Sequence, residues 1–112
     1  AVLATPVARR KFDAAGRIVN TLDRYPQALR EVAAELDVPL IDMNALTARH
    51  LEALGPEASK AEFMWIEPGR WAGVPQGRRD DTHYVERGAR ATAALAAQAL
   101  REQVPALRGW LR

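Results

Sequence analysis

The chain has 112 residues, 48% hydrophobic and 27% charged, a balance typical of one folded globular unit and not of a disordered segment. Its lack of cysteine excludes disulfide frameworks, thiolate zinc sites and cysteine nucleophiles. We expect no nucleic-acid or membrane partner, since the net charge is only +2, the arginines are scattered, and no apolar run nears the roughly 18 residues that span a bilayer.

The first forty residues predict two strands separated by a helix. A short apolar run at residues 2–5 stops at Pro6, as a buried strand that opens into a loop would. A small hairpin is expected around Gly16. Apolar residues at helical spacing then predict a helix from Pro26 to Leu36, and residues 40–41 predict a second short buried strand.

The next segment predicts a helix with a cap at one end and a stop signal at the other. Asp42 stands where a helix cap is expected, and the helix from Ala45 to Leu54 is closed by Gly55 and Pro56. The order strand, helix, strand, helix is typical of a parallel α/β construction. Because such a sheet usually needs more chain to cover both of its faces, we expect this chain to be part of a larger domain.

The second half predicts a loop followed by a long helix. Residues 57–65 are expected to add a short helical stretch, and the Gly- and Pro-rich residues 67–79 a long irregular loop. From residue 105 onward we expect a short extension in which Trp110 and Leu111 cover an apolar edge. Residues 85–104 predict the last helix, with a stripe suited to close packing on a sheet, formed by Ala89, Thr92, Ala96, Ala99 and Gln103.

The sharpest chemical feature is the run Asp80-Asp81-Thr82-His83 between this loop and the last helix. A carboxylate three residues ahead of a histidine can hold its Nδ1–H and leave Nε2 free as a general base. Asp80 has that spacing. Two other interpretations stay open: Asp81 or Thr82 capping the helix beside an exposed histidine, and a metal site formed by Asp80, Asp81 and His83.

A general base needs a nucleophile, and the chain offers one candidate serine. Ser59 is the only serine, and it lacks the Gly-rich strand-to-helix turn that exposes an activated hydroxyl. We interpret Ser59 as an ordinary helical residue, so a serine nucleophile would lie upstream of Ala1. His50, the other histidine, has no ligand spacing around it and is interpreted as a solvated or boundary helix residue.

Several segments together resemble the SGNH (GDSL-type) hydrolases, and among them the rhamnogalacturonan acetylesterase-like carbohydrate esterases. The similarity covers about residues 5–100, and its segments are Ala4-Thr5-Pro6-Val7 with the following arginines, Tyr25-Pro26, Val38-Pro39-Leu40-Ile41-Asp42, Leu54-Gly55-Pro56, Asp80-Asp81-Thr82-His83-Tyr84 and Gly88-Ala89. By this resemblance Asp80 would orient the imidazole, and His83 would act as general base and then acid. Asp81 stands where relatives commonly have Asn.

The resemblance implies a fold and an activity. Residues 1–112 would be the C-terminal portion of a single SGNH hydrolase domain, a three-layer α/β/α (flavodoxin-like) sandwich with a parallel sheet. The nucleophile and the oxyanion-hole residues would belong to the N-terminal half, so this chain alone would hydrolyse nothing. The complete enzyme would deacetylate an acetylated oligo- or polysaccharide such as pectin or rhamnogalacturonan, would need no cofactor, and would be secreted or periplasmic.

Two questions stay open at this point. A non-catalytic carbohydrate-binding or interaction domain could keep the hydrolase fold together with an unused Asp80 and His83. Trp65 and Trp71, near the Gly- and Pro-rich loop, could form a sugar-facing rim or could instead cover the edge of the core.

Overall fold

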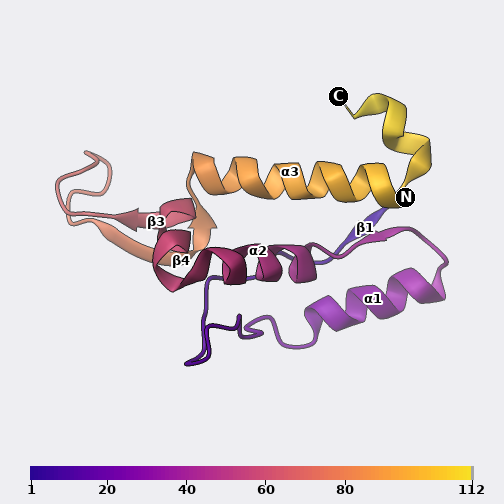
Figure 1. Ribbon diagram of the computed structural model, residues 1–112, viewed down its shortest axis with the longest axis horizontal. Helices are drawn as coiled ribbons and strands as arrows, with labels where there is room; N and C mark the ends of the chain where they lie inside the picture. The colour runs from indigo at the N-terminus through magenta and orange to yellow at the C-terminus, as the bar shows by residue number, and fades with distance from the viewer. Residues whose placement is uncertain (112) are drawn as a thin grey trace.

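The computed structural model describes residues 1–111, and Arg112 lies outside them. The helices α1, α2 and α3 and a projecting hairpin give residues 1–111 their shape, with α3 and α1 on opposite sides of α2 and the chain ends far from the hairpin (Figure 1). The elements in chain order are β1 (Leu3–Ala4), α1 (Tyr25–Glu35), β2 (Leu40–Ile41), α2 (Met43–Ala58), the 3₁₀ helix η1 (Ser59–Glu62), β3 (Phe63–Ile66), β4 (Arg78–Tyr84), α3 (Glu86–Gln103) and the 3₁₀ helix η2 (Pro105–Trp110).

The two predicted strands pair with each other in parallel. Leu3 lies opposite Leu40, and Ala4 lies opposite Ile41. The backbone N–H of Thr5 continues the pairing by donating to the carbonyl of Ile41 at 3.1 Å. A parallel pair needs a crossover connection, and α1 supplies it. The mixed α/β class is therefore confirmed.

Local signals place the first two helices correctly. Helix α1 has a proline in its first turn, as predicted, and Asp42 caps α2 by accepting a hydrogen bond from the backbone N–H of Ala45 at 3.2 Å. The helical path breaks at Gly55, whose φ of 82° and ψ of 172° are not helical. The predicted stop is therefore confirmed at Gly55, and a further helical stretch begins directly after it at Pro56. The predicted hairpin around Gly16 is also present, closed by a bridge between Phe12 and Ile18.

The interpretation of residues 57–65 as helical is wrong for its last part. Helical structure extends to Glu62, and Phe63–Ile66 then form β3, which pairs with β4 in an antiparallel hairpin. A four-residue apolar run cannot be told from a buried helical turn until its partner strand is known. For the same reason the predicted loop at residues 67–79 is too long, because Arg78 and Arg79 pair with β3.

The core lies between the first sheet, α2 and α3. Its centre consists of Ile41, Met43 and Ala99, and the hydrophobic residues packed around them are Val7, Leu46, Leu95, Ala96 and Leu100. The predicted stripe on α3 is thus confirmed at Ala96 and Ala99, whereas Ala89 and Gln103 are exposed. The prediction that Trp110 covers an apolar edge is wrong, because this side chain in η2 is 84% exposed.

Gly88 allows α3 to approach η1 more closely than any other residue could. A Cβ atom at this position would lie 2.2 Å from the backbone carbonyl oxygen of Glu62 and 2.7 Å from the Tyr84 ring. The neighbouring contact is a hydrogen bond from the backbone N–H of Val85 to that same carbonyl, at 3.1 Å. The start of α3 is therefore fixed against η1 directly after β4. Within residues 1–111, the helices include none that is both long and apolar enough to cross a bilayer.

Candidate active site

A bulge in β4 displays the predicted Asp80 and His83. The two-residue step from Phe63 to Trp65 on β3 is matched by a five-residue step from Arg79 to Tyr84 on β4, so the residues in between leave the ladder. We call residues 80–83 the β4 bulge. The sequence predicted these residues at the end of a loop, and the structure places them inside an irregular strand.

The bulge is folded around the carboxylate of Asp80. Its Oδ1 accepts hydrogen bonds from the backbone N–H of Thr82 at 2.8 Å and of His83 at 2.9 Å. An aspartate that binds the backbone two or three residues ahead forms a compact turn, for which its short side chain is well suited. This local turn brings His83 back onto the side of the strand that carries Asp80.

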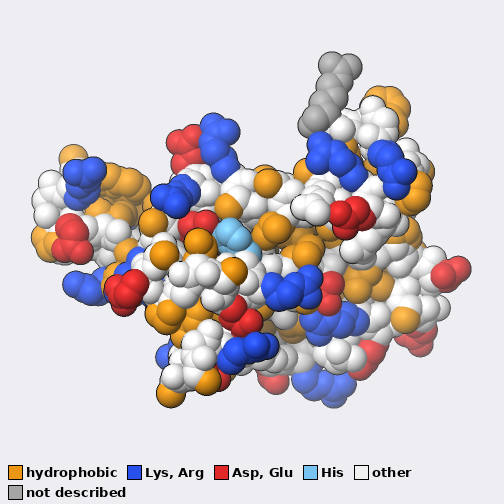
Figure 2. Space-filling model, viewed as in Figure 1, with side chains coloured by type: hydrophobic (Ala, Val, Ile, Leu, Met, Phe, Trp, Pro, Cys, Tyr) orange, Lys and Arg blue, Asp and Glu red, His pale blue; other side chains and the backbone are white. Residues whose placement is uncertain are grey.

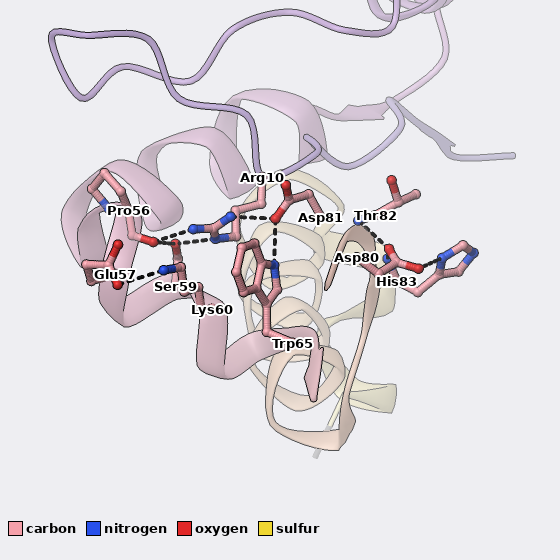
Figure 3. Close-up of polar contacts among 10 residues, drawn as sticks. All are labelled: Arg10, Pro56, Glu57, Ser59, Lys60, Trp65, Asp80, Asp81, Thr82 and His83. Carbon is pink, nitrogen blue, oxygen red and sulfur yellow. Dashed lines mark hydrogen bonds and ion pairs between the residues drawn. The ribbon is translucent and has the colours of Figure 1, made fainter. Parts of the chain in front are cut away.

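The second carboxylate oxygen of Asp80 contacts the imidazole of His83. Oδ2 of Asp80 lies 2.8 Å from Nδ1 of His83, and Arg78 Nη2 lies 3.2 Å from the same oxygen. With Nδ1 as the donor, Nε2 carries the free lone pair and can accept a proton. Nε2 has no hydrogen bond to any part of residues 1–111, and the His83 side chain is 66% exposed and points away from the rest of the site (Figure 3).

The electrostatics keep Asp80 charged. Its pKa is lowered to about 2 by the backbone hydrogen bond from His83, with further lowering by the backbone N–H of Thr82 and by the imidazole itself. A carboxylate that stays ionised at neutral pH can hold Nδ1–H and stabilise the imidazolium that forms when Nε2 takes up a proton.

Asp81 faces the opposite way and belongs to a different cluster. Its Oδ1 accepts hydrogen bonds from Nη1 of Arg10 and, at 2.8 Å, from the indole Nε1–H of Trp65. Figure 3 shows Asp81 on the side of Arg10 and Trp65, with the largely covered Asp80 and the exposed His83 on the other side. Of the two neighbouring aspartates, Asp80 is therefore the one that contacts the imidazole. The catalytic roles of Asp80 and His83 stay predictions.

The same geometry argues against a metal site formed by Asp80, Asp81 and His83. Because Asp81 turns inward to Arg10, the three side chains Asp80, Asp81 and His83 do not converge on one point. Across residues 1–111, histidine and acidic side chains form no group of three or more that could hold a metal ion.

Ser59 and His50 have structural partners of their own. Ser59 is fully buried at the start of η1, where its Oγ accepts a hydrogen bond from Nε of Arg10 at 3.0 Å. His50 lies on α2 with Nε2 2.9 Å from the carboxylate of buried Glu62, which confirms that it is a boundary helix residue. Neither the location nor the exposure of Ser59 suits a nucleophile.

The two tryptophans beside the loop differ in environment. Trp65 is half-buried and lies within about 5 Å of three cations: the guanidinium groups of Arg10 and Arg79 and the ammonium of Lys60. Trp71 is 46% exposed. Both line an open cavity of about 420 Å³, whose other lining residues are Lys60, Ala61, Phe63, Ile66, Glu67, Arg70 and Val85. Trp65 is therefore held among cations within the hairpin, and Trp71 is the more exposed of the two.

Sequence reasoning missed Arg10. The sequence indicated it only as one of the arginines that follow Val7, but the structure separates the neighbours Arg9 and Arg10, with Arg9 exposed and Arg10 buried. Arg10 reaches Asp81, 71 positions later in the chain, and no spacing rule connects the two. Basic and acidic side chains are otherwise interspersed over the face seen in Figure 2.

Comparison with known proteins gives this geometry a context. No family model matches the chain. Over 101 residues, or 90% of its length, the chain is 46% identical to rhamnogalacturonan acetylesterase RhgT of Bacillus subtilis (strain 168). It is 31% identical, again over 90% of its length, to the probable rhamnogalacturonan acetylesterase YesY of the same organism.

The matches cover only part of these relatives. The chain spans 44% of the length of RhgT and 42% of YesY. Among solved structures it resembles the Bacillus subtilis protein YxiM, with a TM-score of 0.70 and 27% identity over 90% of this chain and 25% of that one. The chain is thus homologous to part of the rhamnogalacturonan acetylesterases, and the resemblance predicted from its motifs is confirmed.

Proposed function

We propose, from its homology to rhamnogalacturonan acetylesterases, that this chain is the C-terminal portion of an ester hydrolase that removes acetyl groups from an acetylated polysaccharide of the pectin or rhamnogalacturonan type. The observation that carries the proposal is the Asp80–His83 pair, with a 2.8 Å contact at Nδ1 and an exposed Nε2, in a chain that matches RhgT over 90% of its length.

The proposed architecture is one part of a three-layer α/β/α sandwich of the SGNH type. Its support is the parallel β1–β2 pair, which lies between α3 on one side and α1 on the other (Figure 1). In this arrangement further strands of the same domain would extend the sheet beyond these two. Residues 1–112 would then form the C-terminal portion of a single domain.

In the proposed reaction His83 moves protons for a serine nucleophile. Nε2 takes the proton of the serine hydroxyl as the oxygen attacks the acetyl carbonyl, and the imidazolium returns it to the sugar oxygen as the C–O bond breaks. A water molecule then gives its proton to Nε2 and attacks the acetyl-enzyme, which releases acetate and restores the serine. Asp80 holds Nδ1–H throughout and stabilises the imidazolium.

The nucleophile in this proposal lies outside these 112 residues. Ser59, the only serine, is buried and already hydrogen-bonded to Arg10, so it cannot reach the exposed Nε2 of His83. The oxyanion donors would come from outside as well. We therefore expect the isolated chain to be inactive and the complete protein to need no cofactor.

A second candidate function is carbohydrate binding without catalysis. The observation that favours it is the open cavity beside the exposed Trp71, with Lys60 and Arg70 in its lining. Indole faces stack on the apolar faces of sugar rings, and such a cavity can bind a glycan whether or not an ester is cleaved.

Acetate release separates the two functions. The full-length protein is incubated with acetylated rhamnogalacturonan and, as the control, with the same polymer after alkaline deacetylation, while binding to both polymers is followed by affinity electrophoresis. An esterase releases acetate from the first polymer only. Retardation by both polymers without acetate release would replace the esterase by a binding module.

A further inference from the structure

Arg10 is the most heavily engaged polar side chain near the β4 bulge. It lies in the loop after β1 and is only 7% exposed. Its guanidinium donates to Asp81 through Nη1, to Ser59 through Nε at 3.0 Å and to the backbone carbonyl of Pro56 through Nη2. Its backbone N–H donates to the carbonyl of Asp81 at 2.9 Å. One residue therefore joins the end of α2, η1 and β4.

This engagement fixes both the backbone and the side chain of Asp81. The Asp81 carboxylate is held from a second direction by the indole N–H of Trp65, and the guanidinium carbon lies 4.9 Å from the centre of the Trp65 ring. A planar guanidinium can satisfy three acceptors and stack on an indole at the same time, which an ammonium cannot. Removing the Asp81 carboxylate would leave the charge of the buried Arg10 without its ion-pair partner.

Asp81 is also the residue that connects Arg10 to the Asp80–His83 pair. It lies inside the turn that Asp80 makes with Thr82 and His83, and the pairing register between β3 and β4 skips this stretch. A bulge without regular ladder contacts needs another anchor if its side chains are to keep one orientation. The contacts from Arg10 and Trp65 to Asp81 are such an anchor. We call the side of the bulge that carries Asp81 its inner face, and the side that carries Asp80 and His83 its outer face.

We propose that Arg10 is a positioning residue for the proposed esterase: by holding Asp81 on its own side of the bulge, it directs Asp80 to the opposite side and sets the contact between Asp80 and His83. The inference rests on the proposed function for its catalytic consequence, but its structural part stands on the contacts of Arg10 alone. Arg10 does not touch His83, so it acts through Asp81.

The test compares Arg10→Lys with wild-type full-length protein. Lysine keeps the positive charge but cannot donate to Asp81, Ser59 and the Pro56 carbonyl in the geometry of the guanidinium. We expect kcat for p-nitrophenyl acetate to fall at least about tenfold while KM changes less than about twofold, because the substrate is still bound but the base is misplaced. By ¹³C NMR titration, the Asp80 carboxyl should titrate near 2 in the wild type and closer to its ordinary value in the variant.

A matched control separates positioning from general stabilisation. Arg30 on α1 makes a comparable pair with Asp42, at 2.9 and 3.1 Å, and contacts no residue of the β4 bulge. Arg30→Lys should lower the melting temperature yet leave kcat and the Asp80 pKa as in the wild type. A folded Arg10→Lys protein that also keeps both values would overturn the proposal.

Asp81→Asn serves if Arg10→Lys does not fold. The amide has the same size and retains an acceptor oxygen for Arg10 and Trp65, but it loses the charge attraction, so we expect about a threefold loss in kcat and a smaller rise of the Asp80 pKa. An unchanged kcat together with an unchanged Asp80 pKa would contradict the proposal. If the wild-type protein hydrolyses no ester, the esterase proposal fails, and the Asp80 titration still decides the role of Arg10.

Discussion

The outer and inner faces of the β4 bulge each carry an aspartate, and contacts of different range along the chain hold the two carboxylates. On the outer face Asp80 is bound by groups no more than three positions away, namely the backbone N–H groups of Thr82 and His83 and the exposed imidazole. On the inner face Asp81 is bound by Arg10 and Trp65, which are 71 and 16 positions away. Local contacts thus create the candidate catalytic pair, and distant contacts hold it in place.

The largest effect is expected for His83→Ala, which tests whether catalysis occurs on the outer face. In the full-length protein, His83→Ala should reduce kcat/KM for p-nitrophenyl acetate at least about 1000-fold, because the general base is lost. His50→Ala is the matched control, since His50 is paired with Glu62 inside the fold and should change the rate less than about threefold. Equal losses in the two variants would contradict a special role for the outer face.

The second prediction compares the two aspartates directly. Asp80→Asn removes the charge that stabilises the imidazolium, and we expect about a 100-fold loss in kcat with a nearly unchanged KM. Asp81→Asn should cost about threefold, as given above, because Asp81 acts only through the position of its neighbour. Steady-state kinetics on both variants measure the ratio. A larger loss for Asp81→Asn would exchange the roles assigned to the two faces.

The separation of the contacting residues along the chain explains which of these roles could be predicted from the sequence. The Asp80–His83 spacing, the cap at Asp42 and the break at Gly55 are local features, and the structure shows each contact or break where the sequence placed it. The strand at Phe63–Ile66 and the cluster around Arg10 depend on partners far along the chain. A single sequence contains no pattern that pairs such partners, so neither was predicted.

The third prediction concerns the close packing of α3 against η1 at Gly88. Gly88→Ala should destabilise the protein by about 2 kcal/mol, because its Cβ would collide with the carbonyl of Glu62 and η1 or α3 would have to move. Gly73→Ala is the control, since a Cβ there has nothing within 4 Å. Chemical denaturation of both full-length variants measures the difference. Equal stability of the two would show that α3 and η1 are packed less closely than described.

The smallest expected effect is a pH dependence that belongs to the outer face. The folded-state pKa of Asp80, about 2, lies below its ordinary value of 3.8, so the stability it contributes is present above about pH 4 and is lost as the pH falls towards 2. The difference in unfolding free energy between the wild type and Asp80→Asn should therefore shrink over this window. A difference that does not vary with pH would mean that the Asp80 turn is not formed in solution.

The most direct test of the central claim is covalent labelling of the full-length protein with a fluorophosphonate, located by intact mass and peptide mapping. We predict one adduct, on a serine outside residues 1–112, that forms rapidly in the wild type and in His50→Ala and is lost or greatly slowed in His83→Ala. An adduct on Ser59, no adduct on the folded wild type, or undiminished labelling of His83→Ala would contradict it.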